Sequence, residues 1–429
     1  MSLIMLSKSS IITMNNIPDK TLAGNIIHDL RNGIVPKDGF QYFSVGRQEE
    51  VIADLEGLDY VRQSGHTVKL IIGNYGSGKT LEKHRCKSFA SKKGFVTSSV
   101  DFGPRIRLYA NDGSSLALWK HLVKNLDPSL EIIMDAFVDK CQVDGTDTVE
   151  VAKKALKSIS GVDSNYFNCM VLKYVWAKLE KDEFTKDCVL DWLSGAYRRR
   201  DVARKNLGLD VEEIITDETW YRYLKCFSQF VVLAGFSGLA IYLDEAINLY
   251  KIDSPSLRDK NYESLLGIIN DEESHYLYVM ILGTIDFLKN RKRGLYSYGA
   301  LATRLTVNPH TTKETPDYLQ PVVELMPLDN TSIFLLLKNV KDIYDSAYEN
   351  NLPVTDDDLL ALMEEFLNKP GGADYLMPRE LIKGLIFILD LLLKYPDKHF
   401  SDFCKQAVMA SSSQSEPNPI TTTDNIEEL

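Results

Sequence analysis

The chain has 429 residues, enough for two or three domains of about 150 residues, each with its own hydrophobic core. Hydrophobic residues make up 44% and charged residues 25%, which excludes a largely disordered chain, and the net charge of −11 argues against a protein whose whole surface binds nucleic acid. The six cysteines form no CxxC pair, so we expect reduced thiols and neither a disulfide framework nor a zinc site. The longest apolar stretch, 231–243, is too short to cross a bilayer, and the first residues lack a signal-peptide pattern. The sequence therefore predicts a cytoplasmic protein without a membrane partner.

Five short apolar runs, in chain order, predict β-strands at 68–72, 94–102, 239–243, 276–282 and 322–325. Helical patterns separate these runs, which is typical of crossover connections in a mostly parallel sheet. In such sheets ligands bind at the carboxyl ends of the strands. The expected fold class is therefore α/β.

The spacing of these elements predicts four regions. They are an N-terminal helical segment at 1–50, an α/β domain at 51–328, a helical region at 329–410 and a disordered acidic tail at 411–429. The stretch 115–230 has helical patterns but no strand and is too long for a simple crossover, so we expect it to be a largely helical insertion. In the third region, Thr355 and the three aspartates after it predict the start of a helix.

The segment 73–80, GNYGSGKT, matches the phosphate-binding pattern GxxxxGK[ST] at every fixed position. Glycines let successive backbone N–H groups face phosphate oxygens, Lys79 can reach the β and γ phosphates, and Thr80 can supply a Mg²⁺ ligand. A predicted strand precedes the loop and a helical pattern at 81–91 follows it, which disfavours an ordinary glycine-rich turn with an exposed lysine. The sequence predicts a site for ATP and Mg²⁺ formed by Gly73, Asn74, Tyr75, Gly76, Ser77, Gly78, Lys79 and Thr80. Because the helix after the loop is unusually polar for a buried crossover, we expect it to lie at a rim or to contact a partner.

Two acidic residues, Asp244 and Glu245, directly follow the predicted strand at 239–243. A strand that ends at the carboxyl edge can bring an acid beside the metal of a phosphate loop, with Asp244 holding Mg²⁺ through water and Glu245 orienting or deprotonating the attacking water. Taken alone, a strand followed by an acidic turn is an equally good interpretation. Together with the phosphate loop, the pair favours hydrolysis over phosphate transfer to a second substrate.

Three further polar residues are candidates for supporting roles. Thr284, after the strand at 276–282, could lie between the acids and the γ-phosphate, or it could simply satisfy backbone groups. Arg304 is our first choice, ahead of the basic turn 291–293, for an arginine that acts across the interface of a homo-oligomer; a solvated surface arginine is the alternative. Arg379 begins a helix in the 329–410 region and could lean onto the γ-phosphate, which would make that region a lid that senses ATP.

Two other segments carry weaker signals. The segment 44–50, which contains Gly46 and Arg47, precedes the first strand and is similar to the turn that frames adenine in several ATPase families. A basic cluster lies in the predicted insertion, at Arg198, Arg199, Arg200, Arg204 and Lys205. Contact with DNA is one interpretation of this cluster, and a solvated helix face is the favoured one.

With these motifs together, the chain is similar to P-loop ATPases of the AAA+ and STAND type. More narrowly, it resembles the BREX-system ATP-binding proteins, the BrxD-like family of bacterial anti-phage operons. The segments that carry the resemblance are VGRQEE, IIGNYGSGKT, KKGFVTSSVDF, IYLDEAINL, ILGTIDFLKNRKRGLYSYGALATRL and LMPRELIKG, and it covers most of 25–389. The resemblance implies a P-loop NTPase (AAA+-like) sheet with a helical insertion and a C-terminal helical lid. It also implies a role in defence against phage, beside proteins encoded in the same operon, and it leaves room for engagement of DNA.

Our hypothesis from the sequence is a Mg²⁺-dependent ATPase that couples ATP binding and hydrolysis to conformational change or assembly on DNA or partner proteins. One alternative is a STAND-like nucleotide switch that hydrolyses slowly or not at all, against which the Asp244–Glu245 pair argues. A second alternative is a DNA-binding scaffold in which the nucleotide is structural. A small-molecule kinase has the least support, because no acceptor site is recognisable.

Overall fold

The computed structural model describes residues 17–208, 211–306, 317–368 and 377–412. The chain divides into two compact units, which we call the sheet unit and the helical unit. The sheet unit comprises Gln48–Asn74 and Glu82–Leu325. The helical unit comprises Met1–Arg47, Tyr75–Leu81 and Met326–Leu429, so the greater part of the phosphate loop groups with it.

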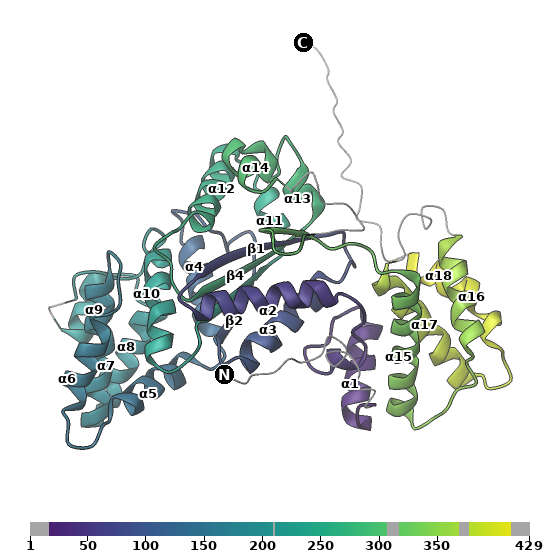
Figure 1. The fold of residues 1–429 in the computed structure, drawn as a ribbon, viewed down its shortest axis with the longest axis horizontal. Helices are drawn as coiled ribbons and strands as arrows, with labels where there is room; N and C mark the ends of the chain where they lie inside the picture. Colours follow the sequence, from purple (N-terminus) through teal and green to yellow (C-terminus); the bar gives the residue numbers. More distant parts are fainter. Residues whose placement is uncertain (1–16, 209–210, 307–316, 369–376, 413–429) are drawn as a thin grey trace, which may run out of the picture. The chain divides into compact units, whose positions relative to one another are not determined.

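A five-stranded parallel sheet forms the centre of the sheet unit (Figure 1), which confirms the α/β class. Its spatial order is β2-β3-β4-β1-β5, with β1 at His66–Ile72, β2 at Val96–Asp101, β3 at Leu239–Asp244, β4 at Leu277–Gly283 and β5 at Val322–Glu324. Each of the five predicted runs forms one of these strands, with ends that differ by one or two residues. Because all the strands run the same way, the residues that follow them meet at one edge of the sheet.

Alternating strand residues pack on opposite faces of the sheet. On one face, Tyr242, Tyr278 and Met280 share a core with α2 (Gln48–Arg62) and α3 (Lys79–Lys92). On the other face, neighbouring residues such as Ile241 and Val279 join a larger core that reaches into the helices of the insertion. The strands are buried on both faces, which explains why their sequences are continuous apolar runs.

The polar helix α3 corrects one expectation. We expected it to lie at a rim or to contact a partner, but the structure buries Glu82, Lys83 and Arg85 within the sheet unit. Each of these charges has an opposite charge beside it: Arg85 pairs with Glu82 one turn away, and Lys83 pairs with a strand-end acid described below. A helix can therefore be polar in sequence and buried in structure when its charges are paired.

The stretch predicted as an insertion is helical throughout its regular elements (Figure 1). Its helices are α4 (Ser114–Lys124), α5 (Leu130–Cys141), α6 (Thr148–Leu156), α7 (Ser164–Glu180), α8 (Glu183–Leu193), α9 (Arg200–Leu207) and α10 (Trp220–Leu233). Phe230 of α10 anchors their packing, with ring centroids 5.0 Å from Phe137 and 5.6 Å from Phe167 in edge-on contacts. These aromatic side chains belong to the same core as the sheet, so the insertion and the sheet form one continuous hydrophobic unit.

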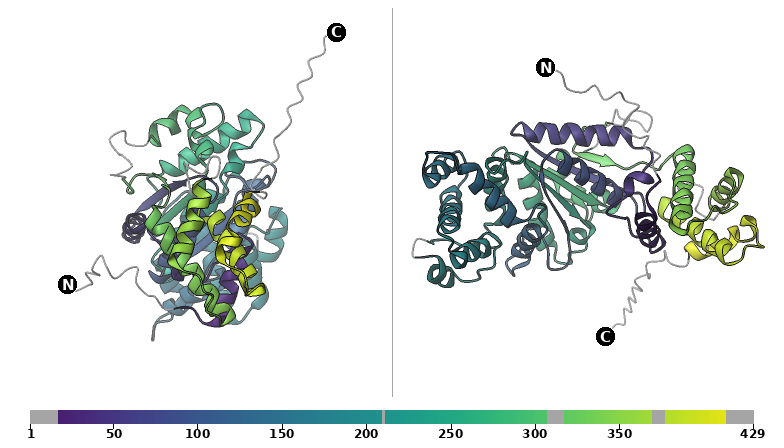
Figure 2. Two further views of the ribbon diagram at one scale, coloured as in Figure 1. Left: turned by 90° about the vertical axis from the view of Figure 1, so that its right-hand side faces the viewer. Right: turned by 90° about the horizontal axis from the view of Figure 1, so that it is seen from below.

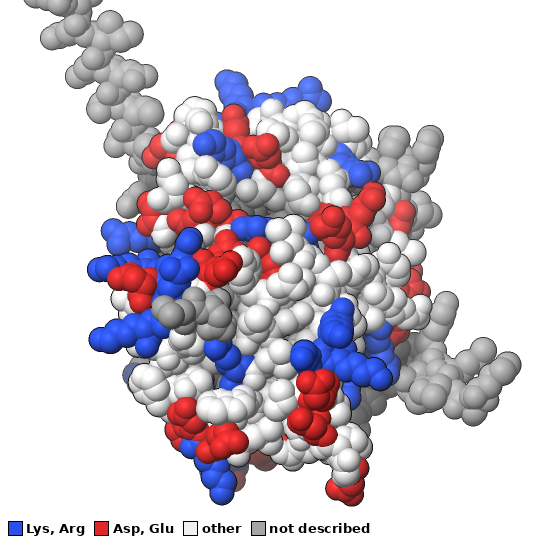
Figure 3. Space-filling view, turned by 90° about the vertical axis from the view of Figure 1, so that its left-hand side faces the viewer, with Lys and Arg blue, Asp and Glu red and all other residues white. Residues whose placement is uncertain are grey.

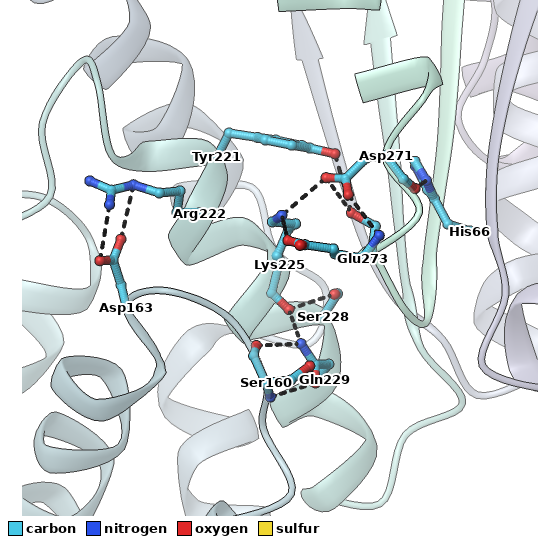
Figure 4. Close-up of polar contacts among 11 residues, drawn as sticks. His66, Ser160, Asp163, Tyr221, Arg222, Lys225, Ser228, Gln229, Asp271 and Glu273 are labelled. Carbon is cyan, nitrogen blue, oxygen red and sulfur yellow. Dashed lines mark hydrogen bonds and ion pairs between the residues drawn. The ribbon is translucent and has the colours of Figure 1, made fainter. Parts of the chain in front are cut away.

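A network of polar side chains, which we call the amino-edge network, fastens α10 to the edge where β1 and β4 begin (Figure 4). The Lys225 ammonium lies 3.3 Å from the Asp271 carboxylate and 3.2 Å from that of Glu273. The backbone carbonyl of Asp271 accepts a 3.2 Å hydrogen bond from Nδ1 of His66, the first residue of β1. The Ser228 hydroxyl donates 2.8 Å to the backbone carbonyl of His275, just before β4. The helix and both strands are thereby held by several directional bonds.

Further helices of the sheet unit lie in the connections from β3 to β4 and from β4 to β5. They are α11 (Ile247–Tyr250), α12 (Pro255–Ile269), α13 (Ile285–Lys289), the 3-10 helix η2 (Leu295–Ser297) and α14 (Gly299–Arg304). Ser254 caps α12 by accepting from the Leu257 N–H, and Pro255 occupies its first turn, where a missing N–H costs nothing.

The helical unit joins an N-terminal helix to the C-terminal helices (Figures 1 and 2). Its elements are α1 (Lys20–Arg31), η1 (Phe40–Tyr42), α15 (Asn330–Tyr348), α16 (Asp356–Leu367), α17 (Pro378–Lys394), η3 (Phe400–Asp402) and α18 (Cys404–Ser412). Asp390 binds two of these helices to α17, because it accepts from Arg31 at 2.7 Å and from the Tyr344 hydroxyl at 2.7 Å. Thr355 caps α16 in a capping box, as its position before three aspartates predicted.

The predicted acidic tail lies, beyond Ser412, outside the described residues. In the part of the chain that the structure describes, no helix combines the length and apolar character that crossing a membrane requires.

Candidate functional site

The phosphate loop connects β1 to α3. β1 ends at Ile72, and the Gly73 N–H donates to the carbonyl of Gly283 at the end of β4. Gly76 and Gly78 have φ angles of +79° and +96°, in the left-handed region that favours glycine, and α3 begins at Lys79. The backbone thus has the strand–loop–helix form that the pattern predicted, with the glycines where the chain must curl.

Arg47 lies against this loop. Its guanidinium donates to the backbone carbonyl of Ser77 at 3.0 Å and to that of Met326 at 2.9 Å. Gly46 and Arg47 both have left-handed φ angles, +64° and +57°. The turn that we predicted to frame adenine therefore presents Arg47 to the loop backbone, and this contact could fix the loop before a nucleotide arrives. No local signal in the sequence predicts it.

Arg379 lies close to the same loop within the helical unit. A Cβ atom built on Gly76 would be 3.5 Å from the Cβ of Arg379, the exposed second residue of α17. Lys79 Nζ stands 5.6 Å from the centre of the Tyr75 ring. The structure thus places Arg379 beside the phosphate loop, and its lid role stays a prediction. A side chain at Gly76 would make an ordinary contact with Arg379, and its cost would come from the left-handed φ.

The predicted acids lie at the carboxyl edge of the sheet. Asp244 is the last residue of β3, it is 7% exposed, and it pairs in register with Asp101 at the end of β2. One carboxylate oxygen accepts the Glu245 N–H at 2.8 Å, and the other accepts Lys83 Nζ at 2.6 Å. The sequence did not lead us to Lys83 or Asp101. Lys83 follows Lys79 by one helical turn, a spacing that could have pointed to it.

Glu245 combines exposure with backbone strain. Its φ angle is +55°, a conformation that is costly for a residue with a side chain, and the residue is exposed. Such outliers concentrate at functional sites, where the surrounding structure holds them in place. Here the neighbour Ala246 is anchored, because its N–H donates to the Leu282 carbonyl at 3.0 Å.

The remaining candidates have structural partners. Thr284 follows β4 at the same edge, and its hydroxyl caps α13 by accepting from the Phe287 N–H at 3.3 Å. This is the backbone-satisfying role that we weighed against a catalytic one. Arg304 ends α14, and its Nε donates 2.7 Å to Asn270, the residue that closes α12 before β4 begins. This contact gives Arg304 a structural partner, and its action across the interface of a homo-oligomer stays a prediction.

The chemistry of two predicted side chains fits a magnesium ion that arrives with a nucleotide. Asp244 in the sheet unit and Thr80 in the helical unit each carry a hard oxygen atom, and Mg²⁺ usually binds one or two protein oxygens together with phosphates and water. Within the described ranges, no group of three or more His, Cys, Asp or Glu side chains is arranged to hold a metal alone.

The members of the basic cluster in the insertion differ in their surroundings. Arg199 pairs with Asp201, and Arg204 Nε donates to the backbone carbonyl of Val211 at 2.8 Å. Arg198, Arg200 and Lys205 are exposed. The space-filling view toward the insertion shows positive and negative side chains interspersed (Figure 3), as on a solvated surface.

Similarity to known proteins is clearest at the level of the family. A family model described as "BREX system ATP-binding protein BrxC/D" matches residues 19–408. None of the curated proteins matches the sequence. Two solved structures share 11% identity with the chain, and the alignment covers 86% of it in both cases. They are the Walker-type ATPase PABY2304 of Pyrococcus abyssi, with a TM-score of 0.37 and 72% of that chain covered, and the ORC2 protein of Aeropyrum pernix in ADPNP–ADP complexes, with 0.42 and 69%. At these TM-scores the two structures are too dissimilar to support conclusions about the site.

Proposed function

Because the chain belongs to the BREX system ATP-binding protein BrxC/D family, and is thus an ATP-binding P-loop protein of phage defence, we propose that it hydrolyses ATP with Mg²⁺. The resulting change in conformation or assembly would act on DNA or on proteins encoded in the same operon. The family covers BrxC and BrxD together, so it fixes the nucleotide and the defence system but not the reaction.

Each proposed role follows from the chemistry of one side chain. Lys79 would neutralise phosphate charge, and Thr80 and Asp244 would offer oxygen ligands to the metal. Glu245 would orient the attacking water and accept its proton. Thr284 would contribute a hydroxyl beside the γ-phosphate, and Arg379 would read the phosphate from α17. A bound Mg²⁺ supplies charge stabilisation for the developing negative charge on the phosphate.

The observation that carries the proposal is the contrast between the two acids after β3. Asp244 is buried and charge-paired, whereas Glu245 is exposed and held at a left-handed φ of +55°. The buried acid is suited to hold a cation, and the exposed acid lies where solvent can reach it. Backbone strain of this kind is enriched at functional sites, which supports a role for Glu245 in the reaction.

Turnover of ATP by the full-length protein, with and without duplex DNA, tests this proposal. We expect Lys79→Ala to lose nucleotide binding, and Glu245→Gln to keep binding while hydrolysis falls by about 10²–10⁴-fold. DNA-stimulated turnover would support action on DNA. Arg198→Ala with Arg200→Ala would then weaken the stimulation and make its salt dependence shallower, because fewer phosphate contacts release fewer counterions. Equal turnover in wild type and Glu245→Gln would contradict the proposal.

A nucleotide switch without fast hydrolysis is the second candidate. The ion pair between Lys83 and Asp244 favours it, because this pair already neutralises the acid that would hold the metal. Tight ATP binding with no turnover, whether or not DNA is present, would select the switch.

A further inference from the structure

Lys83 on α3 lies between two carboxylates that end neighbouring strands. Its Nζ is 2.6 Å from Oδ2 of Asp244 on β3 and 3.6 Å from Oδ1 of Asp101 on β2. The side chains of Lys83 and Asp244 are each 10% exposed, whereas that of Asp101 is 65% exposed. Only the shorter contact is a full hydrogen-bonded ion pair, so the ammonium is shared unequally.

This arrangement leaves Asp244 with both carboxylate oxygens engaged. Oδ1 accepts the Glu245 N–H and Oδ2 accepts Lys83. A divalent cation that binds this carboxylate, directly or through water, would come within a few ångströms of the lysine ammonium. Two positive charges at about 4 Å repel each other strongly where water is largely excluded, so metal and Lys83 compete for Oδ2.

Asp101 offers the displaced ammonium a second partner. It is the register partner of Asp244 in the β2–β3 ladder, so the two carboxylates stand side by side at the carboxyl edge. The distance from Lys83 Nζ needs to shorten only from 3.6 Å to about 2.8 Å to form a normal charge-assisted bond. A rotation of the lysine side chain can make this change without moving the helix.

We propose that Lys83 is a transferable counter-ion: it occupies Asp244 in the metal-free protein and moves to Asp101 when the metal–nucleotide complex binds. The inference rests on the proposed function, which makes Asp244 a metal ligand. Before the metal binds, Lys83 neutralises the charge of the buried Asp244 carboxylate. Because the metal must displace this ammonium, Lys83 also lowers the affinity of the site for metal. Asp101 has the opposite effect, because it stabilises the displaced ammonium. Both are positioning residues for the metal site.

The test compares nucleotide affinity with and without metal in the full-length protein. The probe is a fluorescent, non-hydrolysable ATP analogue, and the quantity is its Kd in EDTA divided by its Kd in Mn²⁺, which we call the metal factor. We expect Lys83→Met to raise the metal factor about tenfold, a modest figure for removing one nearby like charge, and Asp101→Asn to lower it about threefold. Lys93→Met is the matched control. Lys93 follows α3 and pairs with Asp59 at 2.5 Å, so its loss removes the same charge at another position and leaves the metal factor unchanged.

The double variant separates transfer from simple electrostatics. If Asp101 acts only by receiving Lys83, Asp101→Asn has no effect in the Lys83→Met background. A threefold loss that persists in that background would overturn the transfer. If Lys83→Met fails to fold, Lys83→Gln removes the charge and keeps a hydrogen-bond donor, and the same increase is expected.

Failure of this inference differs from failure of the proposed function. A metal factor of about one in wild type, unchanged in Asp244→Asn, would overturn the role of Asp244 as a metal ligand. A large metal factor that Asp244→Asn abolishes, while Lys83→Met and Asp101→Asn match wild type, would overturn only the role of Lys83.

Discussion

The two edges of the sheet use polar residues in opposite ways. At the amino edge, Lys225, Asp271 and Ser228 are each bonded to more than one neighbour, and the bonds join a helix to two strands (Figure 4). At the carboxyl edge, Asp244 depends on a single lysine for its charge, and Glu245 is exposed on strained backbone. The amino-edge side chains thus act as anchors with several partners each. Under the proposed function the carboxyl-edge acids instead serve a ligand, which would have to displace Lys83 from Asp244.

The electrostatics of the amino edge agree with a structural role. Burial by itself would raise the pKa of Asp271, but the Glu273 backbone N–H and the Lys225 charge outweigh it and lower that pKa. The carboxylate is therefore held in its charged form by several partners. A charge satisfied in this way is poorly suited to exchange protons and well suited to fix a helix.

Removing Lys225 should give the largest loss of stability. Its side chain is 15% exposed and that of Asp271 is 9% exposed, so Lys225→Met leaves a buried carboxylate without its cation. We expect a loss of about 2 kcal/mol in the free energy of unfolding, less than for a fully isolated pair because the Glu273 N–H and the Ser274 hydroxyl still reach Asp271. Urea unfolding measures it.

Lys153→Met is the control for that loss. Lys153 on α6 pairs with Glu150 at 3.4 Å, and both side chains are more than half exposed. Its removal should change stability by less than about 0.5 kcal/mol. If the two substitutions cost the same, the amino edge is not the stabilising edge and the contrast fails.

The strain at Glu245 predicts that a glycine variant is more stable than an alanine variant at this position, the reverse of the usual order within a helix. At a φ of +55°, glycine is unstrained and alanine keeps the strain, so Glu245→Gly should be about 1 kcal/mol more stable than Glu245→Ala. Both variants lose the carboxylate, and both should lose turnover. At Glu263, exposed within α12, glycine should instead be about 1 kcal/mol less stable than alanine. Thermal unfolding of the four variants measures the difference in stability between glycine and alanine at each position. If glycine is the less stable variant at both positions, Glu245 is not strained.

Local features of the site could be predicted from the sequence, because they depend on neighbours in the chain. The glycine spacing of the loop specifies left-handed turns at Gly76 and Gly78, and an apolar run followed by two acids specifies a strand that ends at Asp244. The cap at Thr355 follows from one residue and its three successors. Each of these depends on a backbone preference that acts over a few residues.

Contacts between distant segments could not be predicted in the same way. The strand order places β3 and β4 between β2 and β1, and no local pattern encodes it. The register that pairs Asp101 with Asp244 follows from that order, as does the position of Lys83 between them. For the same reason the polar sequence of α3 misled us, since the burial of Lys83 depends on acids that lie elsewhere in the chain. Folding supplies these counter-charges, and composition alone cannot show them.

The smallest effect we predict is a pH dependence at the amino edge. Burial is the main cause that lowers the pKa of His66 below its usual 6.5, and the charge of Lys225 adds to it. Nδ1 donates to the Asp271 carbonyl, so Nε2 is the unprotonated nitrogen, and it is buried with no hydrogen-bond partner among the described residues. The folded chain thus favours neutral histidine. The unfolded chain takes up a proton near pH 6.5, so the contribution of His66 to stability is complete above that pH and decreases as the pH falls toward the lower folded-state pKa.

Unfolding midpoints measured between pH 7.5 and 5.5 test this dependence. His66→Gln removes the titrating group, so its midpoint should fall less steeply with acid than that of wild type, whereas His121→Gln, exposed on α4, should follow wild type. Parallel curves for all three proteins would mean that His66 is accessible to protons in the folded state. The amino edge would then open to solvent as readily as the carboxyl edge, and the difference between them would lie in Glu245 alone.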